Sequence, residues 1–218
     1  MTRIQRFRRR PERSPEGARA AILAAAERVF AQAGLAGART EVIAAEAGVN
    51  KALLFYYFKS KERLYHAILE EHLKAFNQKA LALLTRPGSA RKIMLEYVTL
   101  QFDFISARHR HASLFQQFLG AGGKSSDTLV RKYIVPRSQA VERLLKRGIH
   151  NGEFRQLDPF HAAVSLGALV VFYFSAAPVL RLLGHSNAYS KRSLSRRKEE
   201  VLEFIRRALF RHPEAPSP

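Results

Sequence analysis

Cysteine is absent from the 218-residue chain, and acidic residues are scarce, with 18 Asp and Glu against 37 Lys and Arg. Without cysteine the chain cannot form a disulfide framework or a thiolate zinc site, which is compatible with a reducing compartment. The deficit of acidic residues leaves a formal net charge of +19. So large an excess predicts a polyanionic partner, either nucleic acid or an anionic membrane surface.

Motifs of other protein classes are also missing. The chain has no glycine-rich phosphate loop and no nucleophile elbow, and its 8 histidines are scattered. His109 and His111 do not share a helical face, so they do not predict a metal pair. We therefore expect neither an enzyme nor a cofactor. The basic N-terminus lacks the apolar region of a secretory signal, and we expect a cytoplasmic protein.

Apolar residues recur at helical spacing along most of the chain, and the alternation typical of β-strands is absent. The sequence therefore predicts an all-α fold with a small N-terminal head and a larger helical body. We expect a basic flexible arm over 1–15, a small helical domain over 16–62, a larger helical domain over 63–212, and a tail over 213–218.

The stretch over 40–61 has the pattern of two short helices joined by a glycine turn. Thr40 is placed to cap the first helix, and Gly48 gives the backbone the freedom that the turn requires. Asn50 is placed to cap the second helix. This is the helix-turn-helix pattern, although two short amphipathic helices joined at a glycine also occur in folds that bind no DNA.

The segment over 45–69, AEAGVNKALLFYYFKSKERLYHAIL, closely resembles the DNA-binding core of the tetracycline-repressor-like (TetR) family. That family has an Ala-Gly-Val turn, an aromatic cluster that closes the recognition helix, and a Ser-Lys-Glu-x-Leu start to the next helix, and all three are present here. The resemblance implies a DNA-binding transcriptional regulator, a repressor that binds a palindromic operator as a homodimer and is released by a small-molecule effector.

The resemblance also implies which side chains meet DNA. Lys51 stands where a base-edge reader is expected, and Ala52 and Leu53 would offer apolar surface to thymine methyl groups. The positions that we expect to contact phosphate are Thr40, Tyr56, Tyr57 and Lys61. As an alternative, one of the two tyrosines could simply pack against the first helix.

Two positions depart from the family pattern. Phe55 stands where the family usually has a tyrosine whose hydroxyl meets the DNA backbone, so that hydrogen bond is absent. Glu41 stands where some members have a base-reading arginine. Its carboxylate could accept from cytosine N4 or could only favour the helix N-terminus, so the operator cannot be carried over from the family.

The arm before the motif holds six arginines and two prolines and little that could pack, so we expect it to be disordered in the free protein. Arg8, Arg9 and Arg10 are the side chains that we expect to neutralise phosphates or to enter a minor groove. The alternative is a solvated tail that aids solubility.

After the motif, the spacing predicts further helices with recognisable boundaries. Ser60 is placed to cap a long helix that ends at 86–88, and Asp158 is placed to cap a later one. Pro136 is expected to kink the helix over 128–150. The other expected helices cover 16–33, 89–107, 111–119 and 193–210, and Gly34 is expected to end the first of them.

The run over 162–180 has no charged residue, and about 20 apolar residues suffice for a membrane span. Its polar and helix-breaking residues, and the lack of a second span, favour a buried helix at a dimer interface instead. Because the resembled family dimerises through its last two long helices, we expect interface residues on this run and on 193–210. They are Val164, Val171, Phe174, Leu202, Ile205 and Leu209.

Aromatic side chains of the body offer lining for a pocket that takes an apolar or aromatic effector. The expected lining and orienting residues are Tyr97, Gln101, Phe104, His109, Phe115, Phe118, His161, Phe172 and Tyr173. The alternative is that most of these aromatic residues belong to the core.

Two other functions stay open at the level of sequence. A non-specific architectural DNA-binding protein without an effector would show a steep salt dependence and little sequence preference. A membrane-associated basic protein, built on the run over 162–180 and the arm, would depend on detergent.

Overall fold

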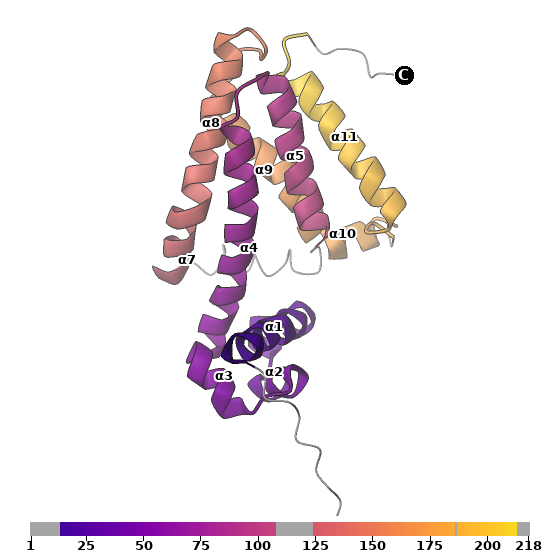
Figure 1. Cartoon of the computed structure of the whole chain (residues 1–218). Coiled ribbons are helices and arrows are strands. Elements are labelled where there is room, and N and C mark those ends of the chain that lie inside the picture. The colour runs from indigo at the N-terminus through magenta and orange to yellow at the C-terminus, as the bar shows by residue number, and fades with distance from the viewer. Residues whose placement is uncertain (1–13, 108–123, 186, 213–218) are drawn as a thin grey trace, which may run out of the picture. The chain divides into compact units, whose positions relative to one another are not determined.

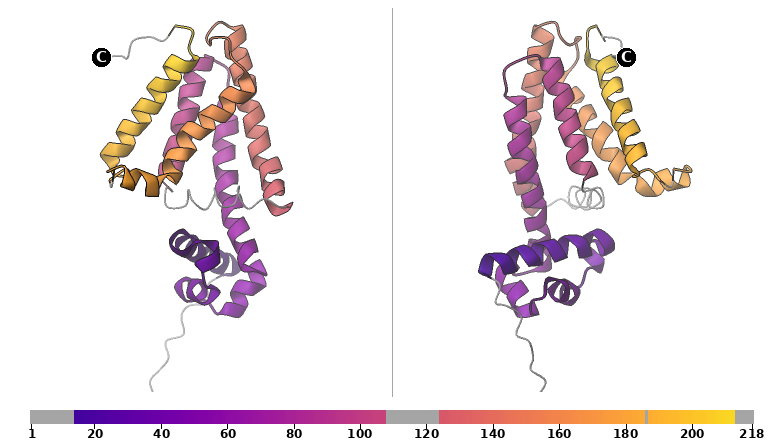
Figure 2. Two further views of the ribbon diagram at one scale, coloured as in Figure 1. Left: turned by 180° about the vertical axis from the view of Figure 1, so that it is seen from behind. Right: turned by 45° about the vertical axis from the view of Figure 1, so that its right-hand side comes forward.

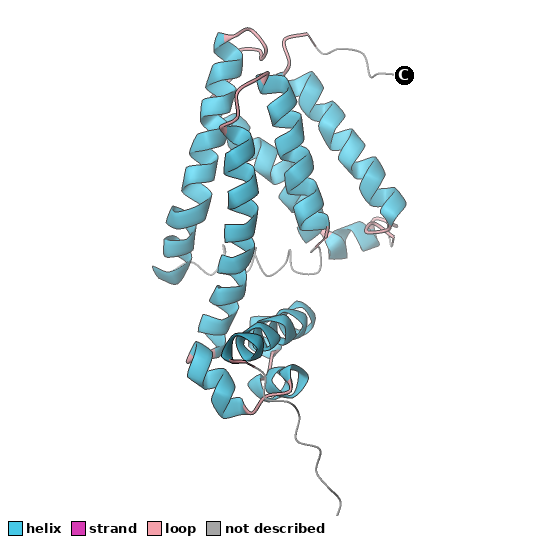
Figure 3. Cartoon of the chain, viewed as in Figure 1, coloured by secondary structure: helices cyan, strands magenta, loops and turns pink. Residues whose placement is uncertain are grey.

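The computed structural model describes residues 14–107, 124–185 and 187–212 (Figure 1). Within these ranges the regular elements are helices, with one isolated β-bridge between Phe154 and Phe210 (Figure 3). The predicted all-α fold is confirmed. The chain divides into two compact units, one up to Ile68 and the other from Leu69 onward.

The first unit contains α1 (Pro15–Gly37), α2 (Thr40–Ala47), α3 (Lys51–Phe58) and the first two turns of α4 (Lys61–Leu84). α1 packs against α2 and α3. The side chains that form the core of this unit are fully or almost fully buried, and they include Ile22, Phe30, Ile43, Leu54 and Leu64. This small core fixes the two short helices against the long first one.

Gly34 does not end the first helix as expected. It has φ 68° and ψ 177°, outside the helical region, but the helix resumes and continues to Gly37. Glycine adopts a positive φ without the steric cost that a Cβ would impose. The residue therefore kinks α1, and the helix ends at Ala38, whose N–H donates to the Gly34 carbonyl at 3.2 Å.

In the described part of the second unit, the rest of α4 is followed by seven further elements. They are α5 (Ala90–Ser106), α7 (Lys124–Leu129), the π-helix η2 (Val130–Ile134), α8 (Val135–His150), α9 (Pro159–Ser175), α10 (Ala177–Leu182) and α11 (Lys191–Leu209). α5 packs against α8, α9 and α11, and α9 runs obliquely across it (Figure 2). The core between these helices includes Met94, Phe102, Leu145, Val170 and Phe174.

Pro136 was expected to kink one long helix, but it lies in the first turn of a new one. The five residues before Val135 form a π-helix, and α8 then begins with Pro136 in its first turn. A proline is tolerated there because the first N–H groups of a helix have no intrahelical acceptor. The helix expected over 128–150 is therefore interrupted before the proline.

The apolar run over 162–180 is divided between two helices. α9 begins with Asp158 as its cap, whose Oδ1 accepts from the His161 N–H at 3.0 Å as expected. It ends at Ser175, and α10 follows with Pro178 in its first turn. No helix in the described ranges is long and apolar enough to cross a membrane.

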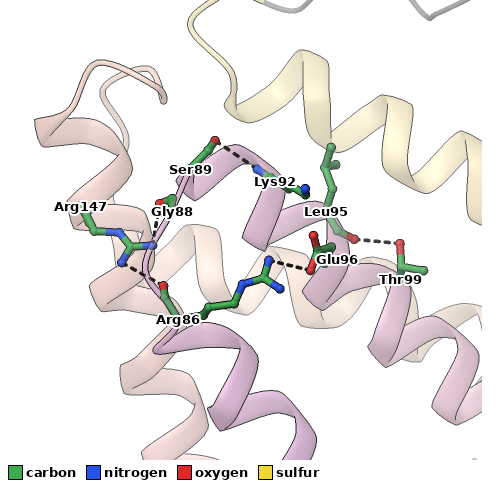
Figure 4. A network of polar contacts seen from close by, with 8 residues as sticks. All are labelled: Arg86, Gly88, Ser89, Lys92, Leu95, Glu96, Thr99 and Arg147. Carbon is green, nitrogen blue, oxygen red and sulfur yellow. Dashed lines mark hydrogen bonds and ion pairs between the residues drawn. The ribbon is translucent and has the colours of Figure 1, made fainter.

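A polar network holds the turn between α4 and α5 (Figure 4). Ser89 caps α5, because its Oγ accepts from the Lys92 N–H at 3.4 Å. Arg147, from α8, donates to the carbonyls of Arg86 and Gly88, each at 3.4 Å. These bonds satisfy carbonyls of the turn that follows α4, and they tie α8 to that turn.

Candidate nucleic-acid interface

α2 and α3 are joined by a tight turn at Gly48. Its φ of 67° and ψ of 34° lie in the left-handed region, and its N–H donates to the Ala45 carbonyl at 3.1 Å. The predicted cap of α3 is confirmed, because Asn50 Oδ1 accepts from the Leu53 N–H at 2.7 Å. A left-handed residue closing one helix and a side-chain cap opening the next together fix the direction of α3.

The predicted cap of α2 is wrong by one residue. Arg39 occupies the cap position, with extended φ and ψ and no side-chain hydrogen bond, and Thr40 is already the first helical residue. The Thr40 hydroxyl donates to the Glu41 carboxylate at 3.4 Å instead. The helix therefore begins without a side-chain cap, and its first N–H groups have no acceptor from Thr40.

One face of α3 is exposed and carries three of the predicted DNA-contacting residues. Leu54 and Phe58 face the core, whereas Lys51 and Ala52 are exposed and Tyr56 is 68% exposed. These three residues lie at spacings of one, four and five, which places them on one side of the helix. The helix-turn-helix therefore presents a face with a cation, a methyl group and a phenol.

Lys51 is held by a carboxylate from α2. Its Nζ lies 2.5 Å from Glu41 Oε1 and 5.7 Å from the centre of the Phe55 ring. Both charged side chains are largely exposed, so the pair is screened by salt. The hydrogen bond from Lys51 keeps the pKa of Glu41 below its ordinary value. The structure thus brings Glu41, Lys51 and Phe55 together on the exposed face.

Tyr57 and Lys61 make contacts within the first unit. The Tyr57 hydroxyl donates to the Pro15 carbonyl at the start of α1, at 3.0 Å. Lys61 Nζ donates to the carbonyls of Ala36 and Ala38, at 3.3 and 3.2 Å. The alternative noted for one of the two tyrosines therefore describes Tyr57, whose hydroxyl is used by the fold.

Lys59 is a cation on this unit that sequence reasoning did not single out. It follows α3 with φ 64° and ψ −39°, and among the described non-glycine residues it alone has a positive φ. Its Nζ lies 5.4 Å from the centre of the Tyr56 ring. The only signal in the sequence was the lack of a glycine at the end of the recognition helix.

Comparisons with known proteins agree with this geometry. A model described as bacterial regulatory proteins of the tetR family matches residues 22–68, and a tetracyclin repressor-like C-terminal domain matches residues 121–205. The HTH-type transcriptional regulator RutR of Escherichia coli K12 is 31% identical over 168 residues, which cover 72% of this chain and 74% of that protein. The chain belongs to the TetR family. It is a helix-turn-helix transcriptional regulator, and regulators of this family bind DNA and small molecules.

Solved structures of other proteins show the same TetR fold. A transcriptional regulator from Saccharomonospora viridis in complex with choline has a TM-score of 0.74 and 23% identity, over 90% of this chain and 100% of that one. FadR from Bacillus subtilis in complex with stearoyl-CoA has a TM-score of 0.69 and 20% identity, over 85% and 96%. At these identities the likeness concerns the fold alone.

Several predicted effector residues of this TetR-family chain lie together in the second unit. On α5, Tyr97 is 5% exposed and Gln101 is 6% exposed. Phe104, one turn further, is half-buried, and its ring centre lies 5.0 Å from that of Phe76 on α4. The predicted residues His109, Phe115 and Phe118, like Arg8, Arg9 and Arg10 of the arm, lie outside the described residues.

Sequence reasoning missed two polar residues beside this group. Arg137 of α8 donates from Nη1 to Asn77 Oδ1 at 2.8 Å, and its guanidinium carbon lies 4.9 Å from the centre of the Phe76 ring. Asn77 in turn donates to the Tyr133 carbonyl at 2.6 Å. Burial raises the pKa of Tyr97 and lowers that of Arg137, and the hydrogen bond between them partly offsets both shifts. Asn77 was recognisable as a polar residue on the buried stripe of its helix.

Three other predicted effector residues do not join this group. His161 is exposed in the first turn of α9, and Phe172 is 66% exposed, so neither points into the interior of the unit. The Tyr173 hydroxyl donates to the Ala188 carbonyl at 2.7 Å, which ties α9 to the segment before α11. The assignment of His161 and Phe172 to the effector site stays a prediction, and the exposure of both side chains places them apart from Tyr97 and Gln101.

The predicted dimer residues are also divided. Phe174, Ile205 and Leu209 are 2%, 1% and 6% exposed, because they form the core of their own chain. Their assignment to an interface is corrected, whereas Val164 is 55% exposed and Val171 and Leu202 are half-buried.

We use the term apolar surface for the exposed large hydrophobic residues on and next to α9, α10 and α11. They are Phe160, Val164, Phe172, Val179, Leu182, Leu183 and Phe204.

Proposed function

We propose that this regulator is a repressor, which binds a palindromic operator as a homodimer and is released when a small-molecule effector binds its second unit. DNA binding is assigned to residues 16–62, and effector binding and dimerisation to residues 63–212. The observation that carries the proposal is the exposed face of α3, with Lys51 held at its start, in a chain of the TetR family.

In the proposed complex the exposed face of α3 enters a major groove. Lys51 donates to a base edge, and Ala52 and Leu53 offer apolar surface to thymine methyl groups. Among the phosphate contacts, Tyr56 is best supported because its phenol is exposed. Thr40 and Lys59 are further candidates, and Arg8, Arg9 and Arg10 add phosphate or minor-groove contacts.

The apolar surface supports the proposed dimer. Phe160, Val164 and Phe172 recur at multiples of four residues, so they form one exposed stripe along α9. Contiguous apolar surface of this kind is rare on monomeric proteins and marks contact sites. A second copy related by a two-fold axis would cover it, and two symmetric heads require two symmetric half-sites in the operator.

Release by an effector requires that the effector bind better to the form of the dimer that does not fit the operator. By linkage, the operator must then weaken effector binding by the same factor. The structures in complex with choline and with stearoyl-CoA support a ligand in the helical body. A regulator with these parts needs no catalytic group.

The proposal is tested by selecting binders from random duplex DNA with the purified protein at near-physiological salt. A palindromic consensus is expected, and sedimentation of the complex should give two chains per duplex. Lys51→Ala should weaken binding chiefly at one base position of each half-site, whereas Lys79→Ala, an exposed lysine of the second unit, should change nothing. Retention of DNA without any consensus would overturn the proposal in favour of an architectural protein.

A further inference from the structure

The second unit contains a buried polar cluster in which, among the described residues, the cation has no acidic partner and one amide oxygen has no hydrogen bond. We infer that the effector is a small molecule with a carboxylate that pairs with Arg137, an apolar body, and a hydrogen-bond donor that reaches Gln101. The inference rests on the proposed function, because it names the class of molecule that occupies the effector site. We use the term Arg137 cluster for Phe76, Asn77, Tyr97, Gln101 and Arg137.

The cation of this cluster has only neutral partners. Arg137 hydrogen-bonds with Asn77 and Tyr97 and lies over the Phe76 ring, and within the described ranges no carboxylate contacts it. Some arginines of this chain are paired with acids, for example Arg86 with Glu96 at 2.8 Å, whereas Arg147 and Arg197 donate to backbone carbonyls. A charge withdrawn from water is normally paired, and the planar guanidinium suits a carboxylate best. A partner carboxylate is therefore expected from outside the chain.

Gln101 supplies a polar atom that has no hydrogen bond among the described residues. It is 6% exposed, and its Oε1 is fully buried without a hydrogen bond among the described residues. It follows Tyr97 by four residues on α5, so it lies on the same side of that helix as the tyrosine that bonds Arg137. A buried acceptor without a hydrogen bond lowers the stability of a fold. A donor group on a ligand would supply the missing bond and restore that stability.

Aromatic rings define the apolar part of the site. The centre of the Phe76 ring lies 5.0 Å from that of Phe104 and 6.4 Å from that of Tyr97. The Arg137 cluster thus combines one cation, one free acceptor and aromatic surface, contributed by α4, α5 and α8. Aromatic or aliphatic hydroxy acids and amino acids with an apolar body have this combination of groups.

The test uses the full chain and matched pairs of compounds. Benzoate, 4-hydroxybenzoate, 4-coumarate, decanoate and hexadecanoate are each compared with the corresponding primary amide by thermal shift and calorimetry. At least one acid should raise the melting temperature, since a ligand that binds only the folded state stabilises it, and its amide should bind about tenfold or more weakly.

Two variants assign the effect to the cluster. Arg137→Gln should weaken binding of that acid about 10- to 100-fold, whereas Arg143→Gln, an exposed arginine of the same helix, should leave it unchanged. Gln101→Leu is the second variant, and we expect it to fold even if Arg137→Gln does not. It should weaken the binding of acids with a hydroxyl group more than the binding of acids without one. The inference is overturned if no acid binds, or if each amide binds as tightly as its acid. It is also overturned if Arg137→Gln binds the acid as tightly as the wild-type protein does.

Failure of this inference is distinguishable from failure of the proposed function. If the protein enriches a palindromic duplex but binds no acid, only the class of effector is wrong. If acids bind through Arg137 but no duplex is enriched, the cluster stands and the proposed function fails. If both stand, the acid should release the wild-type protein from the enriched duplex and should leave Arg137→Gln bound.

Discussion

At the scale of single residues, Glu41 and Lys51 show how a predicted reader of DNA is held before it meets its target. The carboxylate lies 2.5 Å from the ammonium group on an exposed face, so it also lies where phosphates would approach. In the proposed complex it would therefore orient the lysine and repel the nucleic acid. The two effects can be separated by removing the charge while keeping the shape of the side chain.

Glu41→Gln is expected to raise operator affinity by a few-fold at low salt, because a negative charge leaves the interface and Lys51 is freed. The gain should shrink as salt screens the charges. Fluorescence anisotropy with the enriched duplex at several salt concentrations measures it. Glu199→Gln, an equal change of charge on α11, is the control. A loss confined to one base position would instead mean that Glu41 reads a base.

Asn50→Ala should lower the free energy of unfolding by about 1 kcal/mol, because the Leu53 N–H loses its acceptor at 2.7 Å. Urea unfolding followed by circular dichroism measures the change. Asn50→Asp keeps an acceptor at the same place and should restore the stability, while its charge lowers DNA affinity. Equal stability of Asn50→Ala and wild type would show that the cap does not stabilise α3.

Gln101→Leu should raise the free energy of unfolding by about 1 kcal/mol, because a buried acceptor without a described partner is replaced by an apolar group of similar size. Gln78→Leu, on the exposed side of α4, is the control and should change stability little. Thermal unfolding of both variants gives the comparison. A clear loss of stability in Gln101→Leu would mean that the free protein already satisfies the amide.

At the scale of helices, the caps were the features most readily predicted. Asn50 and Asp158 cap their helices as expected, and the predicted cap Ser60 accepts through Oγ from the Arg63 N–H at 3.1 Å. A cap depends on residues three apart, so the sequence contains all of the information. The start of α2 was placed one residue too late, because the local sequence does not decide whether Arg39 or Thr40 is the residue before the helix.

Features that depend on tertiary packing were not predictable from the sequence. α9 is apolar on nearly all sides, so periodicity could not separate the buried Phe174 from the exposed Phe172. The pairing of Arg137 with Asn77 joins residues 60 positions apart in the chain. No local pattern predicts such a contact, and for this reason the polar part of the candidate effector site was missed.

The contact of α8 with the segment after it gives a prediction at this scale. A Cβ added at Gly148 would lie 2.3 and 2.5 Å from two carbons of the Phe154 ring and 3.0 Å from Ala90 Cβ. Gly148→Ala should therefore destabilise the protein by about 1–3 kcal/mol through overpacking. Gly167→Ala, where a Cβ meets nothing within 4 Å, should be neutral or slightly stabilising, as helix propensity favours alanine. Urea unfolding of both variants decides, and equal stabilities would mean that Phe154 moves aside freely.

At the scale of the whole molecule, net charge and the apolar surface point to two different partners. A net charge of +19 favours association with any polyanion, and its contribution falls as salt rises. The apolar surface requires a partner that removes hydrophobic side chains from water, and DNA cannot do so. The proposed dimer would satisfy both requirements, because a second copy would cover the apolar surface and double the number of DNA contacts.

Phe204→Glu tests this division. Phe204 is 58% exposed on α11, so the substitution should leave the fold of the chain intact, but it would bury a carboxylate in the proposed dimer. Sedimentation equilibrium should show a monomer, and binding to the palindromic duplex should fall to the level of a single half-site. Val135→Glu, at a residue 39% exposed on α8, is the matched control and should remain dimeric. A dimer that survives Phe204→Glu would place the contact between subunits away from α11, and tight binding by a monomer would remove the need for a palindrome.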